Sequence, residues 1–120
     1  MKRILSLRLE KEHLTHRKDN YKIIMKPLSF EWDFEKEKKN IRKHGITFEE
    51  ASTVFSDEAA ILFDDPEHSG DEDRFLLLGI SEYAKICIVC HCYRAEDAVI
   101  RIISARRATK NEEKRYVRGI

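Results

Sequence analysis

The sequence predicts an α+β domain in which a small antiparallel β-sheet packs against helices. Two neighbouring apolar runs, 86–93 and 98–105, are joined by a short polar link, which is typical of a β-hairpin. Further strand-like runs precede this hairpin at short spacing, and capped helical segments lie on either side of the strands. We therefore expect the hairpin 86–105 at the centre of the sheet, with an N-terminal helical hairpin and a C-terminal helix.

Capping residues predict the first helix. Asp33 is a good N-cap for a helix over 34–44, and Gly45 is a typical residue to end it. Acidic residues in its first turns and basic residues in its last turn suit the helix dipole. The segment is strongly polar, so we expect its buried face to hold little beyond Phe34, Ile41 and His44.

The other two helices begin with the same type of signal. Thr47 and Glu50 form a capping box for a helix that buries apolar residues around 48–55. Thr109 and Glu112 form another, which opens a basic helix ending near residue 117. The first two helices are therefore expected to pair as a helical hairpin around Gly45.

Three shorter segments are predicted to be strands, at 30–33, 59–63 and 74–80. The acidic loop 64–73 between the last two raises the question of a metal site. Calcium loops need a defined ligand spacing with a glycine turn and a closing carboxylate, and this loop has neither. We interpret it as a solvated loop.

Charge is unevenly distributed along the 120 residues, although the net charge is +1. Residues 1–26 carry eight Lys or Arg against three acids, residues 27–93 carry seven against fifteen, and residues 94–120 carry eight against four. A basic end that begins on the central hairpin is suited to bind a polyanion. The composition, 42% hydrophobic and 38% charged, is that of one soluble domain.

The first 25 residues are predicted to lie outside this domain, which we place at 26–120. They form a basic extension with little apolar periodicity. Two interpretations stand: a disordered basic arm, or an artefact of a misplaced translation start with Met25 as the true first residue.

Three cysteines, Cys87, Cys90 and Cys92, crowd into one apolar run together with His91. The pattern matches haem-attachment and metal-site motifs, but alternation along a strand points these side chains to opposite faces. We interpret the cysteines as small buried hydrophobes and expect neither metal nor other cofactor. The lack of a signal peptide or membrane span in the sequence favours a cytoplasmic protein, in which we expect these thiols to be reduced.

Several blocks together resemble the BrnT family over about residues 28–118. They are Phe30-Glu31-Trp32-Asp33, Asn40, Lys43-His44-Gly45-Ile46, Phe48, Ala51, Asp65-Pro66, Asp73-Arg74, Gly79, His91, Arg94 and Ile100-Arg101-Ile102-Ile103-Ser104-Ala105-Arg106. The family consists of toxins of type II toxin–antitoxin systems with a fold similar to RelE-type ribonucleases.

The resemblance implies an endoribonuclease that inhibits translation by cleaving RNA, free or on the ribosome, and that a BrnA-type antitoxin neutralises. It implies contact with DNA through the antitoxin complex alone and no contact with a membrane. RNA can be cut without a metal ion when its 2′-hydroxyl attacks the adjacent phosphate, given proton-transfer groups and cations. A non-catalytic module that binds nucleic acid or a partner within a repressor complex is the alternative.

Polar residues on the central hairpin are the candidates for this chemistry. As catalytic residues we select Arg94, Arg101, Arg106 and His91. As RNA-binding residues we select Arg74, Tyr93, Arg107 and Lys110.

Each candidate also has a structural interpretation. His91 suits a hydrogen-bonded core histidine, and Arg101 suits an ion pair with Glu31 or Asp33. A solvated helix face suits the basic residues Arg107, Lys110, Lys114 and Arg115. Side-chain alternation also separates Arg101 from Arg106, so a single basic face requires a bulge, a strong twist or a strand end.

Overall fold

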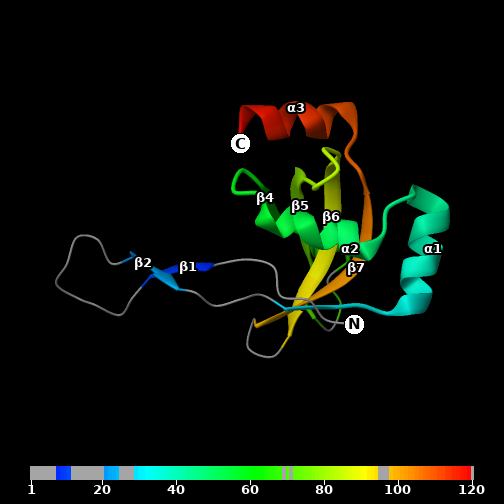
Figure 1. Cartoon of the computed structure of the whole chain (residues 1–120), viewed down its shortest axis with the longest axis horizontal. Coiled ribbons are helices and arrows are strands. Elements are labelled where there is room, and N and C mark those ends of the chain that lie inside the picture. The colour runs from blue at the N-terminus through cyan, green and yellow to red at the C-terminus, as the bar shows by residue number, and fades with distance from the viewer. Residues whose placement is uncertain are drawn as a thin grey trace.

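The computed structural model describes residues 8–11, 21–24, 29–68, 70, 72–94 and 98–119. A five-stranded sheet forms its main body, in the spatial order β3-β7-β6-β5-β4 (Figure 1). The strands are β3 (Ser29–Glu31), β4 (Ile61–Asp64), β5 (Phe75–Ile80), β6 (Ile86–Arg94) and β7 (Val99–Arg107). The hairpin strands β6 and β7 lie inside the sheet, which confirms the α+β class and the central place of the hairpin.

The sheet is mixed because its strands do not all pair in the antiparallel sense. Strands β4, β5, β6 and β7 form antiparallel pairs in order, as expected from short connections. Strand β3 lies parallel to β7, with Phe30 opposite Ile100. Most of the chain separates β3 from β7, so no hairpin turn constrains their relative direction, and this edge differs from the predicted antiparallel sheet.

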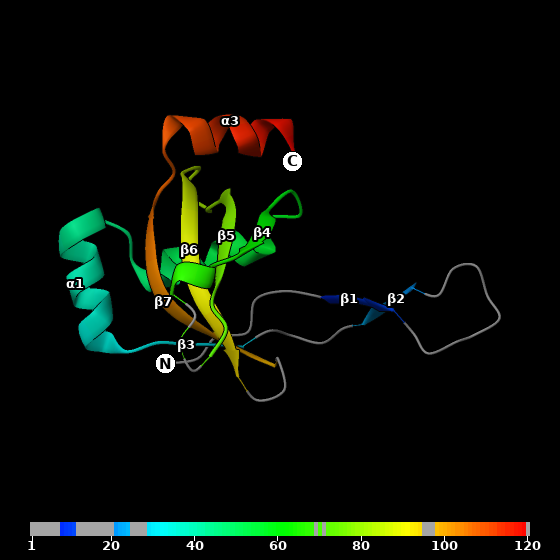
Figure 2. The same ribbon diagram turned by 180° about the vertical axis from the view of Figure 1, so that it is seen from behind.

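The helices begin and end where their caps predict. They are α1 (Phe34–His44), α2 (Phe48–Thr53) with the 3₁₀ turn η1 (Val54–Ser56) directly after it, and α3 (Lys110–Arg118). The Asp33 carboxylate accepts a hydrogen bond from the Glu35 N–H at 2.8 Å, and Gly45 has a φ of 71°, where glycine is favoured. Thr109 and Glu112 form the predicted capping box. Figure 2 shows α1 beside β7 and α3 across one end of the sheet.

Helix α1 is attached to the sheet by hydrogen bonds, and not by the apolar face that the sequence suggested. Phe34 is 55% exposed and Ile41 is 41% exposed, whereas Asn40 is buried. The Asn40 amide donates to the carbonyls of Ile46 and Ala105, both at 2.9 Å, and accepts from the Ala105 N–H at 3.0 Å. A fully paired buried amide fixes the helix against β7 with little apolar contact, which is why the predicted burial was wrong.

The hydrophobic core lies on one face of the sheet, which we call the core face. Its buried members are Phe30, Trp32, Ile46, Phe48, Ala51, Val54, Leu77, Cys87, Val89, Ile100, Ile102 and Ala105. They come from α2, η1, the residues around them and the four strands other than β4. The opposite face of the sheet carries different side chains, described below as the groove face.

Gly79 on β5 packs tightly against the segment after α2. A Cβ at this position would lie 2.8 Å from Val54 Cγ1 and 2.9 Å from Ala60 Cβ. We expect Gly79→Ala to lower the free energy of unfolding by about 1–3 kcal/mol, because the well-packed core must shift to admit the methyl group. Urea unfolding will measure it, with Gly70→Ala as the control, where nothing lies within 4 Å. Equal midpoints for both variants would contradict the prediction.

The N-terminal region contains two described strands, β1 (Arg8–Lys11) and β2 (Tyr21–Ile24), which form a separate two-stranded antiparallel sheet. The expected boundary between residues 25 and 26, and Met25 itself, fall outside the described residues. Within the part of the chain that the structure describes, no helix is long and apolar enough to cross a membrane.

Candidate functional site

A bulge in β7 determines which arginines share a face of the sheet. Positions 90 and 91 of β6 pair with positions 104 and 102 of β7, so Ile103 is an extra residue. In a regular strand Arg101 and Arg106 would point to opposite faces, because their spacing is odd. Because of the bulge, Arg101 pairs with Cys92 and Arg106 pairs with Ile88. These two β6 residues are an even number of positions apart, so both arginines lie on the groove face. The bulge is therefore the feature that places Arg101 and Arg106 on one face, which the sequence alone did not establish.

A cavity of about 330 Å³ lies on the groove face, and we call it the sheet groove. Its lining residues are His44, Asp65, Glu67, Arg74, Leu76, Ile88, Cys90, Ile103, Ser104 and Arg106. The apolar members form its floor on the three central strands, and the titratable members come from the surrounding elements. Such a mixture of apolar floor and convergent polar groups is typical of a ligand site.

Besides the Cys90 thiol, five titratable side chains reach the groove from the elements and loops around it. His44 is the last residue of α1, where Gly45 turns the chain away. Asp65 and Glu67 follow β4, Glu67 within the 3₁₀ turn η2 (Pro66–His68). Arg74 directly precedes β5, and Arg106 lies near the end of β7. Two cations, two carboxylates and one imidazole thus meet over the sheet.

Arg106 is held in position by α3. Its guanidinium donates to both carboxylate oxygens of Glu112, at 2.8 and 3.0 Å. This bidentate bond lowers the pKa of Glu112 to about 2 and raises the pKa of Arg106. Glu112 also accepts from the Thr109 N–H at 2.8 Å as part of the capping box. One carboxylate therefore both starts α3 and orients a cation of the groove.

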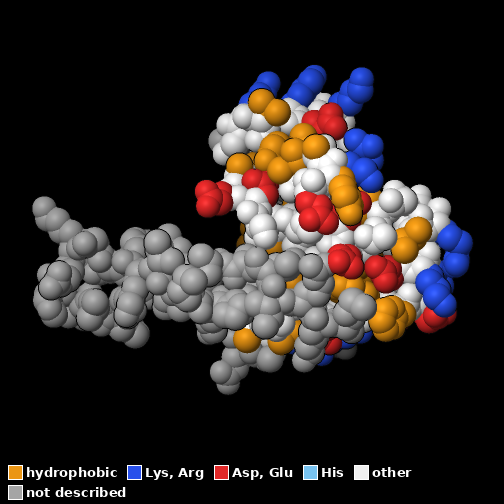
Figure 3. Space-filling model, viewed as in Figure 1, with side chains coloured by type: hydrophobic (Ala, Val, Ile, Leu, Met, Phe, Trp, Pro, Cys, Tyr) orange, Lys and Arg blue, Asp and Glu red, His pale blue; other side chains and the backbone are white. Residues whose placement is uncertain are grey.

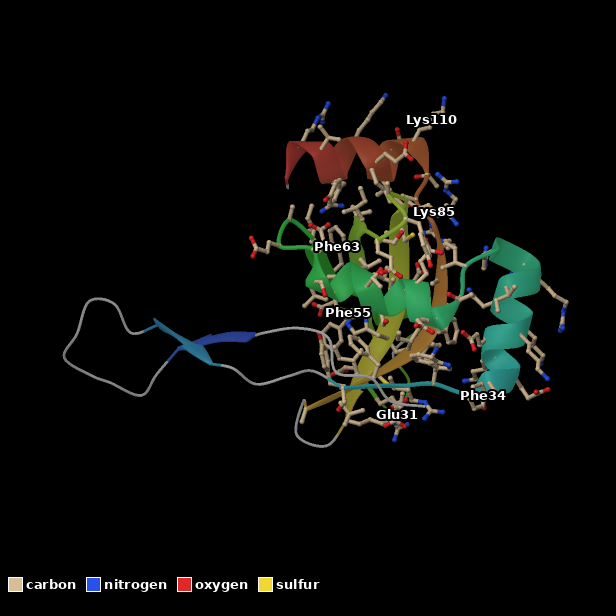
Figure 4. The ribbon with its side chains drawn as sticks, viewed as in Figure 1. Glu31, Phe34, Phe55, Phe63, Lys85 and Lys110 are labelled. Carbon is tan, nitrogen blue, oxygen red and sulfur yellow. The ribbon has the colours of Figure 1, made fainter. Side chains whose placement is uncertain are left out.

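Arg94 and Arg101 lie on the groove face but do not line the groove. Arg101 donates to Glu31 of β3 at 3.1 Å, which confirms the structural interpretation of an ion pair. Arg94 lies 3.5 Å from Glu72, and both side chains are nearly half exposed. Figure 4 shows Glu31 at the end of the sheet opposite α3 and Lys110. Arg101 is therefore partly neutralised and distant from α3.

His91 and Tyr93 lie on the core face, away from the groove. His91 is fully buried, its Nδ1 lies 3.1 Å from the Val89 carbonyl oxygen, and its Nε2 lies 3.2 Å from the Tyr93 hydroxyl. The rings of Phe55 and Phe75 also contact it. Burial lowers the pKa of His91 to about 4. The imidazole is neutral at pH 7 and completes the core, so the geometry favours its structural interpretation.

The three cysteines of β6 are buried and free. Burial raises the pKa of Cys87 and of Cys90 to about 11, so both are protonated thiols at pH 7. Cys90 donates a weak hydrogen bond to Asp65 at 3.8 Å, at the floor of the groove. Over the described ranges no three His, Cys, Asp or Glu side chains converge as metal ligands would.

The remaining predicted residues lie outside the groove. Arg107 is exposed and pairs in register with Cys87, which places it on the core side of the sheet. Lys110 is the exposed first residue of α3. Of the eight selected residues, the structure brings Arg74 and Arg106 together in one cavity.

Two groove residues were missed by the sequence reasoning. His44 was interpreted as a cation at a helix end, and Glu67 as part of a solvated loop. Neither belongs to the central hairpin, so their approach to it depends on how α1 and η2 dock. The block Lys43-His44-Gly45, which supported the family resemblance, was the available signal for His44.

Comparison with known proteins identifies the family. The family model described as ribonuclease toxin, BrnT, of type II toxin–antitoxin systems matches residues 32–112, more than half of the chain. The crystal structure of the Brucella abortus ribonuclease toxin BrnT matches with a TM-score of 0.51 and 23% identity, over 66% of this chain and 94% of that chain. No curated protein sequence matches. The chain therefore belongs to the BrnT family of ribonuclease toxins of type II toxin–antitoxin systems.

Proposed function

We propose that the sheet groove binds a phosphodiester of RNA and cleaves it without a metal ion. The observation that carries this proposal is the meeting of two guanidinium groups, an imidazole and two carboxylates in one cavity of about 330 Å³. Arg74 and Arg106 provide planar cations whose geometry matches phosphate oxygens. His44 and Glu67 are side chains able to transfer protons. Together they supply the groups that metal-free cleavage of RNA requires.

The proposed reaction is attack by the 2′-hydroxyl on the adjacent phosphorus. The 2′-oxygen forms a bond to phosphorus, its proton passes to a base, and the bond from phosphorus to the 5′-oxygen breaks as an acid protonates that oxygen. We assign the proton transfers to His44 and Glu67. The charge that develops on the phosphate oxygens is stabilised by Arg74 and Arg106. The products are a 2′,3′-cyclic phosphate and a 5′-hydroxyl.

The other residues selected from the sequence take different roles in this proposal. Arg94 and Arg101 flank the groove on its own face and act as outer contacts for RNA. Arg107 and Lys110 remain RNA-binding candidates near α3. His91 and Tyr93 stabilise the core beneath the groove.

The biological setting that we propose follows from membership in the family. The ribonuclease acts on RNA in the cytoplasm, inhibits translation, and is neutralised by a BrnA-type antitoxin. Its contact with DNA occurs through the complex with that antitoxin. Co-expression with the neighbouring gene product should allow purification of a complex, and free, harmless expression of the untagged chain alone would contradict this setting.

Cleavage of naked RNA by the purified chain in the presence of EDTA tests the proposed function. We expect cleavage that yields cyclic phosphate ends and that a single 2′-deoxy substitution at the cleaved position abolishes. Cleavage that stops in EDTA would overturn the metal-independent mechanism. If naked RNA stays intact, RNA on ribosomes is the next substrate, and resistance of both would support a non-catalytic binding module.

A further inference from the structure

A second cavity, of about 300 Å³, lies beside the sheet groove along α1. Its lining residues are Lys36, Lys39, Asn40, Lys43, His44, Ile103 and Ser104. His44, Ile103 and Ser104 also line the sheet groove, so the two cavities adjoin along the β7 bulge. A ligand in the groove can therefore extend towards α1 without crossing a helix or strand.

The three lysines of this cavity form a stripe on one side of α1, which we call the lysine stripe. Lys36, Lys39 and Lys43 follow the i, i+3, i+7 spacing that aligns side chains along a helix. All three are exposed. Lys38 and Arg42 point to other sides of the same helix and do not line the cavity.

Charge balance distinguishes the lysine stripe from the sheet groove. The groove is lined by two arginines and two carboxylates, and Arg106 is further paired with Glu112. The described residues that line the second cavity include three lysines and no carboxylate. Within the described part of the chain, Lys38 pairs with Glu35 at 3.3 Å, whereas no ion pair involves the stripe. The positive charge of the second cavity is therefore balanced less than that of the sheet groove. Figure 3 shows Lys and Arg side chains over α1 and over α3.

We propose that the lysine stripe binds the backbone of single-stranded RNA on one side of the scissile phosphate. This inference rests on the proposed function, because it takes the phosphate in the sheet groove as its starting point. The stripe spans about 10 Å at 1.5 Å per helical residue. At roughly 3.4 Å per stacked nucleotide, that length matches about three phosphates.

The residues that line the second cavity also indicate whether the lysine stripe selects an RNA sequence. Lysine ammonium groups contact phosphate oxygens as point charges and carry little geometric selectivity. Among the described lining residues, the one aromatic ring is the imidazole of His44, to which we assign a proton transfer, and the apolar side chain is that of Ile103. The stripe therefore increases affinity for longer RNA without selecting a sequence.

Binding of a short fluorescein-labelled 2′-O-methyl oligouridylate, which cannot be cleaved by 2′-hydroxyl attack, tests the inference in the full chain. The stripe variant combines Lys36→Gln and Lys39→Gln. The matched control variant on the same helix combines Lys38→Gln and Arg42→Gln. Lys43 stays intact because it also stabilises the C-terminal end of α1. Fluorescence anisotropy across a salt series gives the slope of log affinity against log salt.

The stripe variant should reduce that slope by roughly 1.4, from two contacts at about 0.7 each, and the control by less than half as much. Equal losses in both variants, or no binding by the wild-type chain, would overturn the inference. Cleavage of a dinucleotide, too short to reach the stripe, should be the same in the stripe variant and the wild type. Stripe-dependent binding without any cleavage would instead overturn the proposed function and leave this RNA-binding surface in place.

Discussion

Replacing Arg106 with alanine is expected to slow RNA cleavage by about 10²–10³-fold, the cost of removing one preorganised group that stabilises transition-state charge. Arg106 lines the sheet groove and is oriented by a bidentate bond to Glu112. Arg106→Lys should recover a minor part of the rate, because an ammonium group keeps the charge but loses the planar fork. Single-turnover cleavage of a labelled RNA measures the effect.

The control for this prediction distinguishes the effect of the Arg106 guanidinium from the effect of its ion pair with Glu112. Glu112→Gln removes the carboxylate charge and one of the two acceptors of Arg106 but leaves the guanidinium in the groove, so cleavage should fall much less than in Arg106→Ala. Thermal unfolding of both variants shows whether α3 stays folded. A comparable loss of rate in Glu112→Gln would mean that the ion pair, and not the guanidinium, matters.

Arg101→Ala distinguishes the site in the structure from the site first predicted. Arg101 lies on the same face but pairs with Glu31 outside the groove. Its loss should therefore affect cleavage much less than the loss of Arg106. Equal losses of cleavage rate in Arg101→Ala and Arg106→Ala would show that Arg101 is a catalytic residue, as the sequence predicted.

Acid should destabilise the folded chain through His91 before it protonates the exposed carboxylates. The pKa of His91 is about 4 in the folded chain, against 6.5 for an unperturbed histidine. Between these values the unfolded chain binds a proton that the folded chain excludes, so stability is complete above pH 6.5 and falls as the pH decreases. At about 1.4 kcal/mol per pKa unit, the loss reaches about 3 kcal/mol near pH 4.

Urea unfolding of the wild type and of His91→Gln between pH 7.5 and 4 measures this loss. The substitution removes the titrating group, so the difference in free energy of unfolding between the two proteins should narrow as the pH falls through 6.5. Parallel curves over the whole range would show that another group causes the acid sensitivity.

The fold could be predicted from the sequence because its signals are local. Asp33 and Gly45 mark the ends of α1, Thr109 marks the start of α3, and apolar runs mark the main strands. The site could not be predicted to the same extent because it depends on distant partners. Glu112, which binds Arg106, lies on α3, and no local sequence pattern predicts that His44 lines the sheet groove.

The burial of α1 shows a second limit of sequence reasoning. The few apolar residues of this polar helix, Phe34 and Ile41, were predicted to face the core. In the structure one buried amide, Asn40, fixes the helix through three hydrogen bonds. A polar residue in a polar helix gives no signal of this role. Likewise, nothing in the composition of the hairpin distinguishes a catalytic histidine from a core one.

The bulge at Ile103 has a consequence for how sequences of such strands are compared. Arg101 and Arg106 are separated by five positions, yet they occupy the same face, as two residues four positions apart would in an uninterrupted ladder. A chain lacking Ile103 would present both guanidinium groups on the same side with regular pairing. When this chain is aligned with a chain that lacks the bulge, a one-residue gap at Ile103 keeps residues of the same face aligned. An alignment without that gap pairs residues from opposite faces on one side of the bulge.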